Sequence, residues 1–210
     1  MGNRWGVGSV QPRMTLAHAE PRFRFHDPET PLAYERLLRA APRTGRCPVW
    51  LGEGAVERVG AWVPVVVPPL DPLGVLQEWG PVERLAAGPA PLRDELVAEA
   101  VAWAEHDARR VRLVVGEGRG PAELVATLGW SGAAGVRDLA GLATVLRSWE
   151  KRFGAAVVEL GADRMTLTVA APPGSSYEAG RVAVEHAAVC PGLDVDGYRL
   201  GDARVWRLRW

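Results

Sequence analysis

The sequence is poor in several residue types, and each absence narrows the class of protein. Of its 210 residues one is lysine (Lys151), none is isoleucine, and two are cysteine (Cys47 and Cys190). Scarce lysine and isoleucine beside abundant Ala, Gly, Val, Pro and Arg indicate a GC-rich genome, so the arginines need not reflect phosphate binding. Neither cysteine belongs to a CxxC pair, which argues against a structural zinc site. We therefore predict no metal and no other cofactor.

Long apolar runs and an excess of one charge are also missing. The 25 basic side chains balance 25 acidic ones, so neither nucleic acid nor an anionic membrane is an expected partner. No run approaches the roughly 18 apolar residues of a membrane span, and the first thirty residues lack an apolar signal core. We expect a cytoplasmic protein, with both cysteines as buried thiols rather than a disulfide.

What the chain does contain is enough apolar sequence for a folded core, at 48% hydrophobic residues. Residues 1–29 show no clear periodicity and are predicted to be a loosely ordered N-terminal arm with one short strand. Residues 30–90 are predicted to form a small α/β subdomain, which ends where Pro and Gly become frequent. Its expected elements are a helix at 30–42 and strands at 47–51 and 62–68.

Residues 91–210 are predicted to form an α+β domain with the order α-β-α-α-β-β-α-β, in which helices pack against a mostly antiparallel sheet. The clearest helix has Asp138 as its N-cap, an apolar stripe that includes Trp149, and Gly154 just beyond its end.

Two further patterns lie in the same segment. Apolar residues alternate with Thr166 and Thr168, which predicts a strand with one buried face and one face in water. Ser175 and Glu178 have the spacing of a capping box and predict the start of another helix.

Three stretches in order, "TVLRSWEKRFGAAVVELGADRMTLTVAAPP", "VAVEHAAVCP" and the tryptophan-rich tail, resemble the bacterial family called domain of unknown function 4253. The resemblance implies a fold rather than a function. The matching residues expected to be structural are Trp149, Gly154, Pro172, Pro173 and Pro191. The other matches are Asp163, Glu185, His186, Cys190, Trp206 and Trp210. Members usually follow the Cys-Pro pair with Asp and Asn, whereas "GLDVDG" stands here.

Glu185, His186 and Cys190 are the candidate catalytic residues, together with Asp163. His186 and Cys190 are four apart, so a helix places them on one face, where an imidazole could activate a thiol. The alternative is a half-buried histidine beside a core thiol, since Cys190 would lie at the helix C-terminus, which disfavours an anion. Metal binding by this pair would need further ligands.

Trp206 and Trp210 alternate with Arg207 and Arg209 at the end of the chain. This pattern predicts either an exposed Trp/Arg binding strip or a strand with its tryptophans in the core and its arginines in water. A third candidate, the glycine loop at Gly116–Gly120, precedes a helix and resembles a phosphate-binding turn.

The function expected from these patterns is non-catalytic binding of another protein or an accessory role, of which an immunity-like role is one form. The alternative is a small hydrolase or thiol-dependent enzyme that uses Cys190 and His186 with Asp163 or Glu185. The sequence leaves the oligomeric state open.

Overall fold

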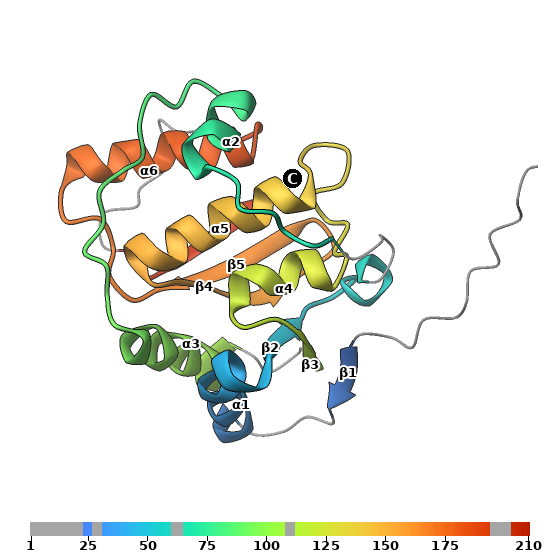
Figure 1. Cartoon of the computed structure of the whole chain (residues 1–210). Helices are drawn as coiled ribbons and strands as arrows, with labels where there is room; N and C mark the ends of the chain where they lie inside the picture. The colour runs from blue at the N-terminus through green and yellow to red at the C-terminus, as the bar shows by residue number, and fades with distance from the viewer. Residues whose placement is uncertain (1–22, 27–30, 60–64, 108–111, 194–202) are drawn as a thin grey trace, which may run out of the picture.

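The helices and strands are those of a computed structural model that describes residues 23–26, 31–59, 65–107, 112–193 and 203–210 (Figure 1). The helices are α1 (Pro31–Thr44), α2 (Pro72–Trp79), α3 (Arg93–Asp107), α4 (Pro121–Thr127), α5 (Leu139–Phe153) and α6 (Ser176–Val189). The strands are β1 (Phe23–His26), β2 (Arg46–Leu51), β3 (Arg112–Glu117), β4 (Ala155–Leu160), β5 (Arg164–Val169) and β6 (Val205–Arg209). A short 3₁₀ helix, Val56–Arg58, follows β2. None of the helices in these ranges is long and apolar enough to cross a bilayer.

The elements after residue 91 confirm the predicted α+β fold. They follow the order α3-β3-α4-α5-β4-β5-α6-β6, as expected from the sequence. The strands form one six-stranded sheet in the order β1-β3-β2-β4-β5-β6. Every neighbouring pair is antiparallel except β2 with β4, which is parallel.

Strand β2 connects the two halves of the chain. It lies before the expected boundary near residue 90, and it pairs with β3 on one side and β4 on the other. Its buried side chains join the same core as those of α5 and β5. The described residues before and after position 90 therefore share one sheet and one core. Of the arm expected at 1–29, residues 23–26 form the edge strand β1, and the remainder lies outside the described residues.

Helices cover both faces of the sheet (Figure 1). Helices α4 and α5 lie on one face with α2 and α6 beside α5, and α1 and α3 lie on the other. The prediction that Thr166 and Thr168 face water is wrong, because α3 packs over β5 and both threonines are buried. The Thr166 hydroxyl donates to the Glu159 carboxylate at 3.0 Å, which satisfies it there.

Local capping fixes the ends of α5 and α6 as predicted. The Asp138 carboxylate accepts from the Gly141 N–H at 2.7 Å, and Gly154 takes the left-handed conformation with φ 61°. The Ser175 hydroxyl accepts from the Glu178 N–H at 3.2 Å. The Glu178 carboxylate, however, accepts from the Ala87 N–H at 2.6 Å, so its polar contact is to the chain before α3.

The strand expected at 62–68 is not formed in its described part. Residues 65–68 have irregular backbone, and residues 62–64 lie outside the described ranges. Pro68 and Pro69 cannot donate to a ladder. The Val65 N–H donates instead to the Ala126 carbonyl at the end of α4, at 3.2 Å.

Candidate functional site

His186 lies in the core between two tryptophans. Its ring centroid is 4.6 Å from that of Trp149 on α5 and 4.7 Å from that of Trp206 on β6, with both pairs edge to face. Burial lowers the pKa of His186 from 6.5 to about 3, and the charge of Arg152 acts in the same direction. The imidazole is therefore uncharged at neutral pH and packs as an aromatic ring.

A buried ion pair joins α6 to α5. The Glu185 carboxylate accepts from two guanidinium nitrogens of Arg152, at 2.9 and 2.6 Å. It also accepts from the Trp149 indole N–H and the Ala86 backbone N–H, each at 2.7 Å. Arg152 in turn donates to the Ala86 carbonyl at 2.7 Å. The Glu185 carboxylate therefore has a structural role, because its hydrogen bonds attach the segment around Ala86 to α5 and α6.

Cys190 ends α6, and its backbone N–H donates to the His186 carbonyl at 2.7 Å. Burial raises the pKa of its thiol to about 12, opposed by a backbone hydrogen bond from Arg209 and by the charge of Arg137. A nucleophilic cysteine needs a lowered pKa and access to solvent. Cys190 has neither property, because its pKa is raised and its side chain is buried.

Asp163 lies in the turn between β4 and β5, apart from the buried Glu185 carboxylate. It accepts from the Arg209 guanidinium at 3.1 Å, and both side chains are substantially exposed. The Asp163 carbonyl accepts from the Trp210 N–H at 2.9 Å. Each candidate carboxylate is thus paired with a different arginine, one in the core and one at the surface.

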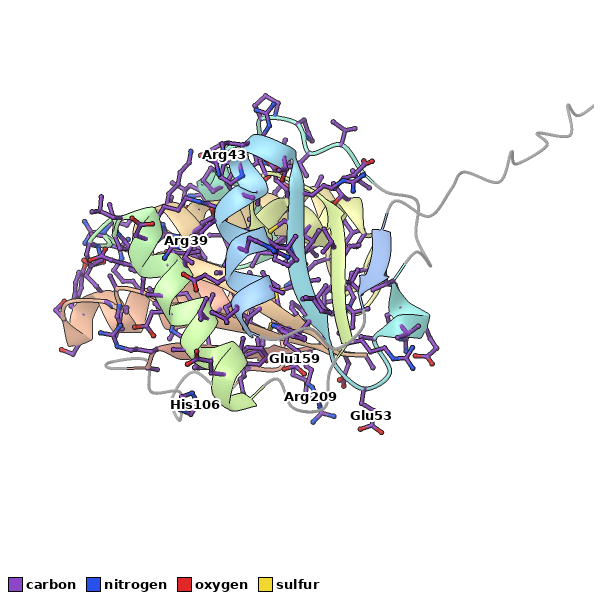
Figure 2. All side chains as sticks on the ribbon, turned by 90° about the horizontal axis from the view of Figure 1, so that it is seen from below. Arg39, Arg43, Glu53, His106, Glu159 and Arg209 are labelled. Carbon is purple, nitrogen blue, oxygen red and sulfur yellow. The ribbon has the colours of Figure 1, made fainter. Side chains whose placement is uncertain are left out.

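The residues of the Trp/Arg strip separate onto two faces of β6. Trp206 is buried, and Trp210 is half-buried with its indole N–H donating to the Val189 carbonyl at 3.0 Å. Arg207 and Arg209 are exposed, and Figure 2 shows Arg209 pointing away from the sheet. Of the two predicted placements, the structure has the tryptophans toward the core and the arginines in water.

The glycine loop at Gly116–Gly120 is closed by the protein's own carboxylates. The Arg119 N–H donates to the Glu123 carboxylate at 3.0 Å. A β-carbon on Gly120 would lie 3.2 Å from a carboxylate oxygen of Glu150. Two acids therefore stand where a phosphate would approach the start of α4, and they would repel it.

The residues expected to be structural lie at element ends or in the core. Trp149 is fully buried, and Gly154 ends α5. Pro173 is buried and Pro172 half-buried after β5, while Pro191 follows α6 at the surface. Across the described part of the chain, no group of three or more His, Cys, Asp and Glu side chains is placed to hold a metal ion.

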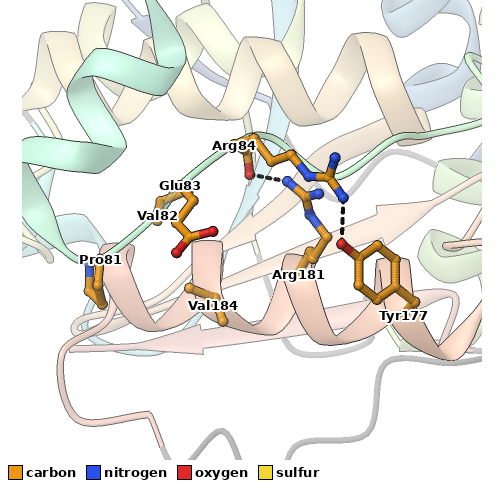
Figure 3. Close-up of a pocket in the computed structure, with 7 residues that line it drawn as sticks. All are labelled: Pro81, Val82, Glu83, Arg84, Tyr177, Arg181 and Val184. Atoms are coloured by element: carbon orange, nitrogen blue, oxygen red, sulfur yellow. Dashed lines mark hydrogen bonds between the residues drawn. The ribbon is translucent and has the colours of Figure 1, made fainter.

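A surface pocket of about 170 Å³ lies beside α6 (Figure 3). Tyr177 is 61% exposed, and the guanidinium carbons of Arg84 and Arg181 lie 5.7 and 5.8 Å from its ring centroid. Arg84 donates to the Tyr177 hydroxyl, and Arg181 donates to the Arg84 carbonyl at 2.6 Å. The lining residues, called the Tyr177 surface below, are Pro81, Val82, Glu83, Arg84, Tyr177, Arg181 and Val184.

The Tyr177 surface was not predicted from the sequence. The four-residue spacing of Tyr177 and Arg181 could have placed both on one face of α6. The contact of Arg84 with Tyr177 could not be predicted, because the two residues are 93 positions apart in the sequence.

The fold and core define an α+β protein with a mixed sheet. The sequence model of a family described as domain of unknown function (DUF4253) matches residues 112–210, from β3 to β6. The resemblance noted in the sequence is thereby confirmed over the C-terminal half of the chain. No curated protein and no solved structure matches the chain.

Proposed function

We propose that this chain is a non-catalytic binding protein that recognises another protein through the Tyr177 surface. The observation that carries the proposal is an exposed tyrosine in a surface pocket, with two arginine guanidinium groups near its ring. Tyrosine and arginine are enriched at protein interfaces and at their energetic hot spots. Val184, which is 37% exposed, adds apolar area beside them.

The two arginines of the Tyr177 surface are held by hydrogen bonds within the protein itself. Arg181 is fixed by bonds to the Arg84 and Leu85 carbonyls, at 2.6 and 3.0 Å, and Arg84 by its bond to Tyr177. Side chains already held in place lose less conformational entropy on binding. Neither guanidinium lies within 4.0 Å of a carboxylate of the described residues. Both charges can therefore pair with acidic groups of a partner.

The environments of the candidate catalytic residues support binding rather than catalysis. An uncharged, buried His186 and a protonated Cys190 are poor starting states for thiol chemistry. We also propose an accessory role and a cytoplasmic location. The location is supported by the two free cysteines, which are buried thiols suited to a reducing compartment.

Site-specific photocrosslinking in the native host tests the proposal. A benzophenone amino acid replaces Tyr177 in one variant and Leu32 in the control, since Leu32 is 72% exposed on α1, away from the Tyr177 surface. We expect one protein to crosslink from position 177 and not from position 32. Arg181→Glu should abolish that crosslink while the circular dichroism spectrum stays unchanged. Equal products from both positions, or a crosslink that survives Arg181→Glu, would contradict the proposal.

A further inference from the structure

A second cavity, of about 400 Å³, lies between α5, the start of α2 and the segments on either side of α2. One wall is apolar and consists of Pro69, Leu70, Pro72 and Leu85. A cavity of this volume falls within the range that accommodates small organic ligands. Leu70 is 41% exposed, so the cavity is reached from solvent.

The opposite wall is polar and comes from one face of α5. Its residues follow helical spacing and are Thr144, Arg147, Ser148, Lys151 and Arg152. Three of these five side chains are cationic, and no acid lines the cavity. The wall therefore favours an anion.

The three cations are not equally available. Arg152 is held by Glu185, and Arg147 lies 3.4 Å from a Glu123 oxygen. Lys151, the sole lysine of the sequence, has no carboxylate within 4.0 Å among the described residues. It is the cation that a ligand can pair with at least cost, since no existing ion pair must be broken.

Ser148 supplies a polar group beside Lys151. Its side chain is largely buried, and its oxygen accepts from the Arg152 Nε at 3.1 Å. A hydroxyl that accepts one bond can still donate its own hydrogen. A carboxylate in the cavity could thus receive hydrogen bonds from both an ammonium and a hydroxyl group.

We propose that this cavity binds a small organic carboxylate, with its charged group at Lys151 and Ser148 and its apolar body against Leu70 and Leu85. The site is separate from the Tyr177 surface and does not depend on the function proposed for it. A bound ligand would bridge α5 and the chain around α2.

Isothermal titration calorimetry with 1-naphthoate tests this site, with neutral 1-naphthalenemethanol and inorganic phosphate as companion probes. We expect saturable binding of 1-naphthoate, and binding of each companion at least about tenfold weaker, because each lacks either the charge or the apolar body. Lys151→Ala should weaken 1-naphthoate about tenfold and leave 1-naphthalenemethanol unchanged, whereas Lys151→Arg retains binding.

The matched control is Arg43→Ala, which removes one exposed cation on α1, on the other face of the sheet. It should leave 1-naphthoate binding unchanged. The proposal is overturned if 1-naphthoate does not bind saturably, if phosphate or the alcohol binds as tightly, or if Lys151→Ala and Arg43→Ala have the same effect.

Discussion

At the residue scale, burial decides the chemistry of the polar groups on α6. Glu185 and His186 are both fully buried, yet one is an ionic anchor and the other an uncharged ring. The difference lies in their neighbours, because Glu185 faces a guanidinium while His186 faces two indoles. The cluster that suggests catalysis in the sequence therefore stabilises the junction of α5, α6 and β6.

Glu185→Gln should destabilise the fold strongly. The substitution leaves the largely buried Arg152 guanidinium without its counter-charge, and breaking a buried pair in this way costs about 3–5 kcal/mol. Urea unfolding followed by tryptophan fluorescence measures the loss. Asp163→Asn, which breaks the exposed pair with Arg209, should cost less than about 1 kcal/mol. Similar losses for the two variants would contradict the role given to Glu185.

His186 should make the protein sensitive to acid. Its pKa is lowered in the folded state, so between pH 6.5 and about 3 the unfolded chain binds a proton that the folded chain does not. Stability is therefore fully present above pH 6.5 and falls as the pH drops, by up to about 1.4 kcal/mol per pH unit from this group. His186→Gln should flatten the pH dependence of the urea midpoint in this window. Equal profiles for the unchanged protein and His186→Gln would refute the assignment.

Cys190 should be inert in the native protein. Because its pKa is raised to about 12, the thiolate is scarce at pH 8, and burial blocks access to it. Cys47 is buried as well, and its pKa is also raised. Ellman's reagent should therefore label neither thiol until urea unfolds the chain. Rapid native labelling of Cys190 would favour the thiol-enzyme alternative.

At the element scale, local sequence was a good guide where the stabilising contacts are local. The caps of α5 lie within the helix's own ends, so Asp138 and Gly154 could be identified without knowing the fold. The network of Glu185 with Arg152 spans 33 positions and was not predictable. The threonine face of β5 was misread for the same reason, since only tertiary structure places α3 over it.

Two glycines should respond oppositely to alanine. Gly154 has φ 61°, and an added β-carbon would lie 2.7 Å from the Pro91 Cγ and 2.8 Å from the Ala170 Cβ. Gly154→Ala should destabilise by more than about 1 kcal/mol. Gly180, inside α6, has nothing within 4 Å of that position, so Gly180→Ala should stabilise by about 0.5–1 kcal/mol. Thermal unfolding checks both, and shifts of the same sign would show that helix geometry does not govern these sites.

At the scale of the whole molecule, the sheet order could not be predicted from the sequence. The order of the elements along residues 91–210 was predicted, but the insertion of β2 between β3 and β4 depends on contacts between distant segments. The predicted boundary near residue 90 reflects real Pro and Gly content. Most of these Pro and Gly residues lie in the irregular segments before and after α2. Strands from both sides of these segments belong to the same sheet.

The position of β2 predicts that the family-matched segment will not fold alone. A fragment of residues 112–210 lacks β2, so β3 and β4 lose their common neighbour, and Glu185 loses its bond to Ala86. We expect it to show no cooperative urea transition and poor amide dispersion in NMR spectra. The matched control, residues 31–210, removes the edge strand β1 but keeps β2 and should unfold cooperatively. A cooperatively folded 112–210 fragment would instead establish an independent C-terminal domain, with β2 as an addition to its sheet.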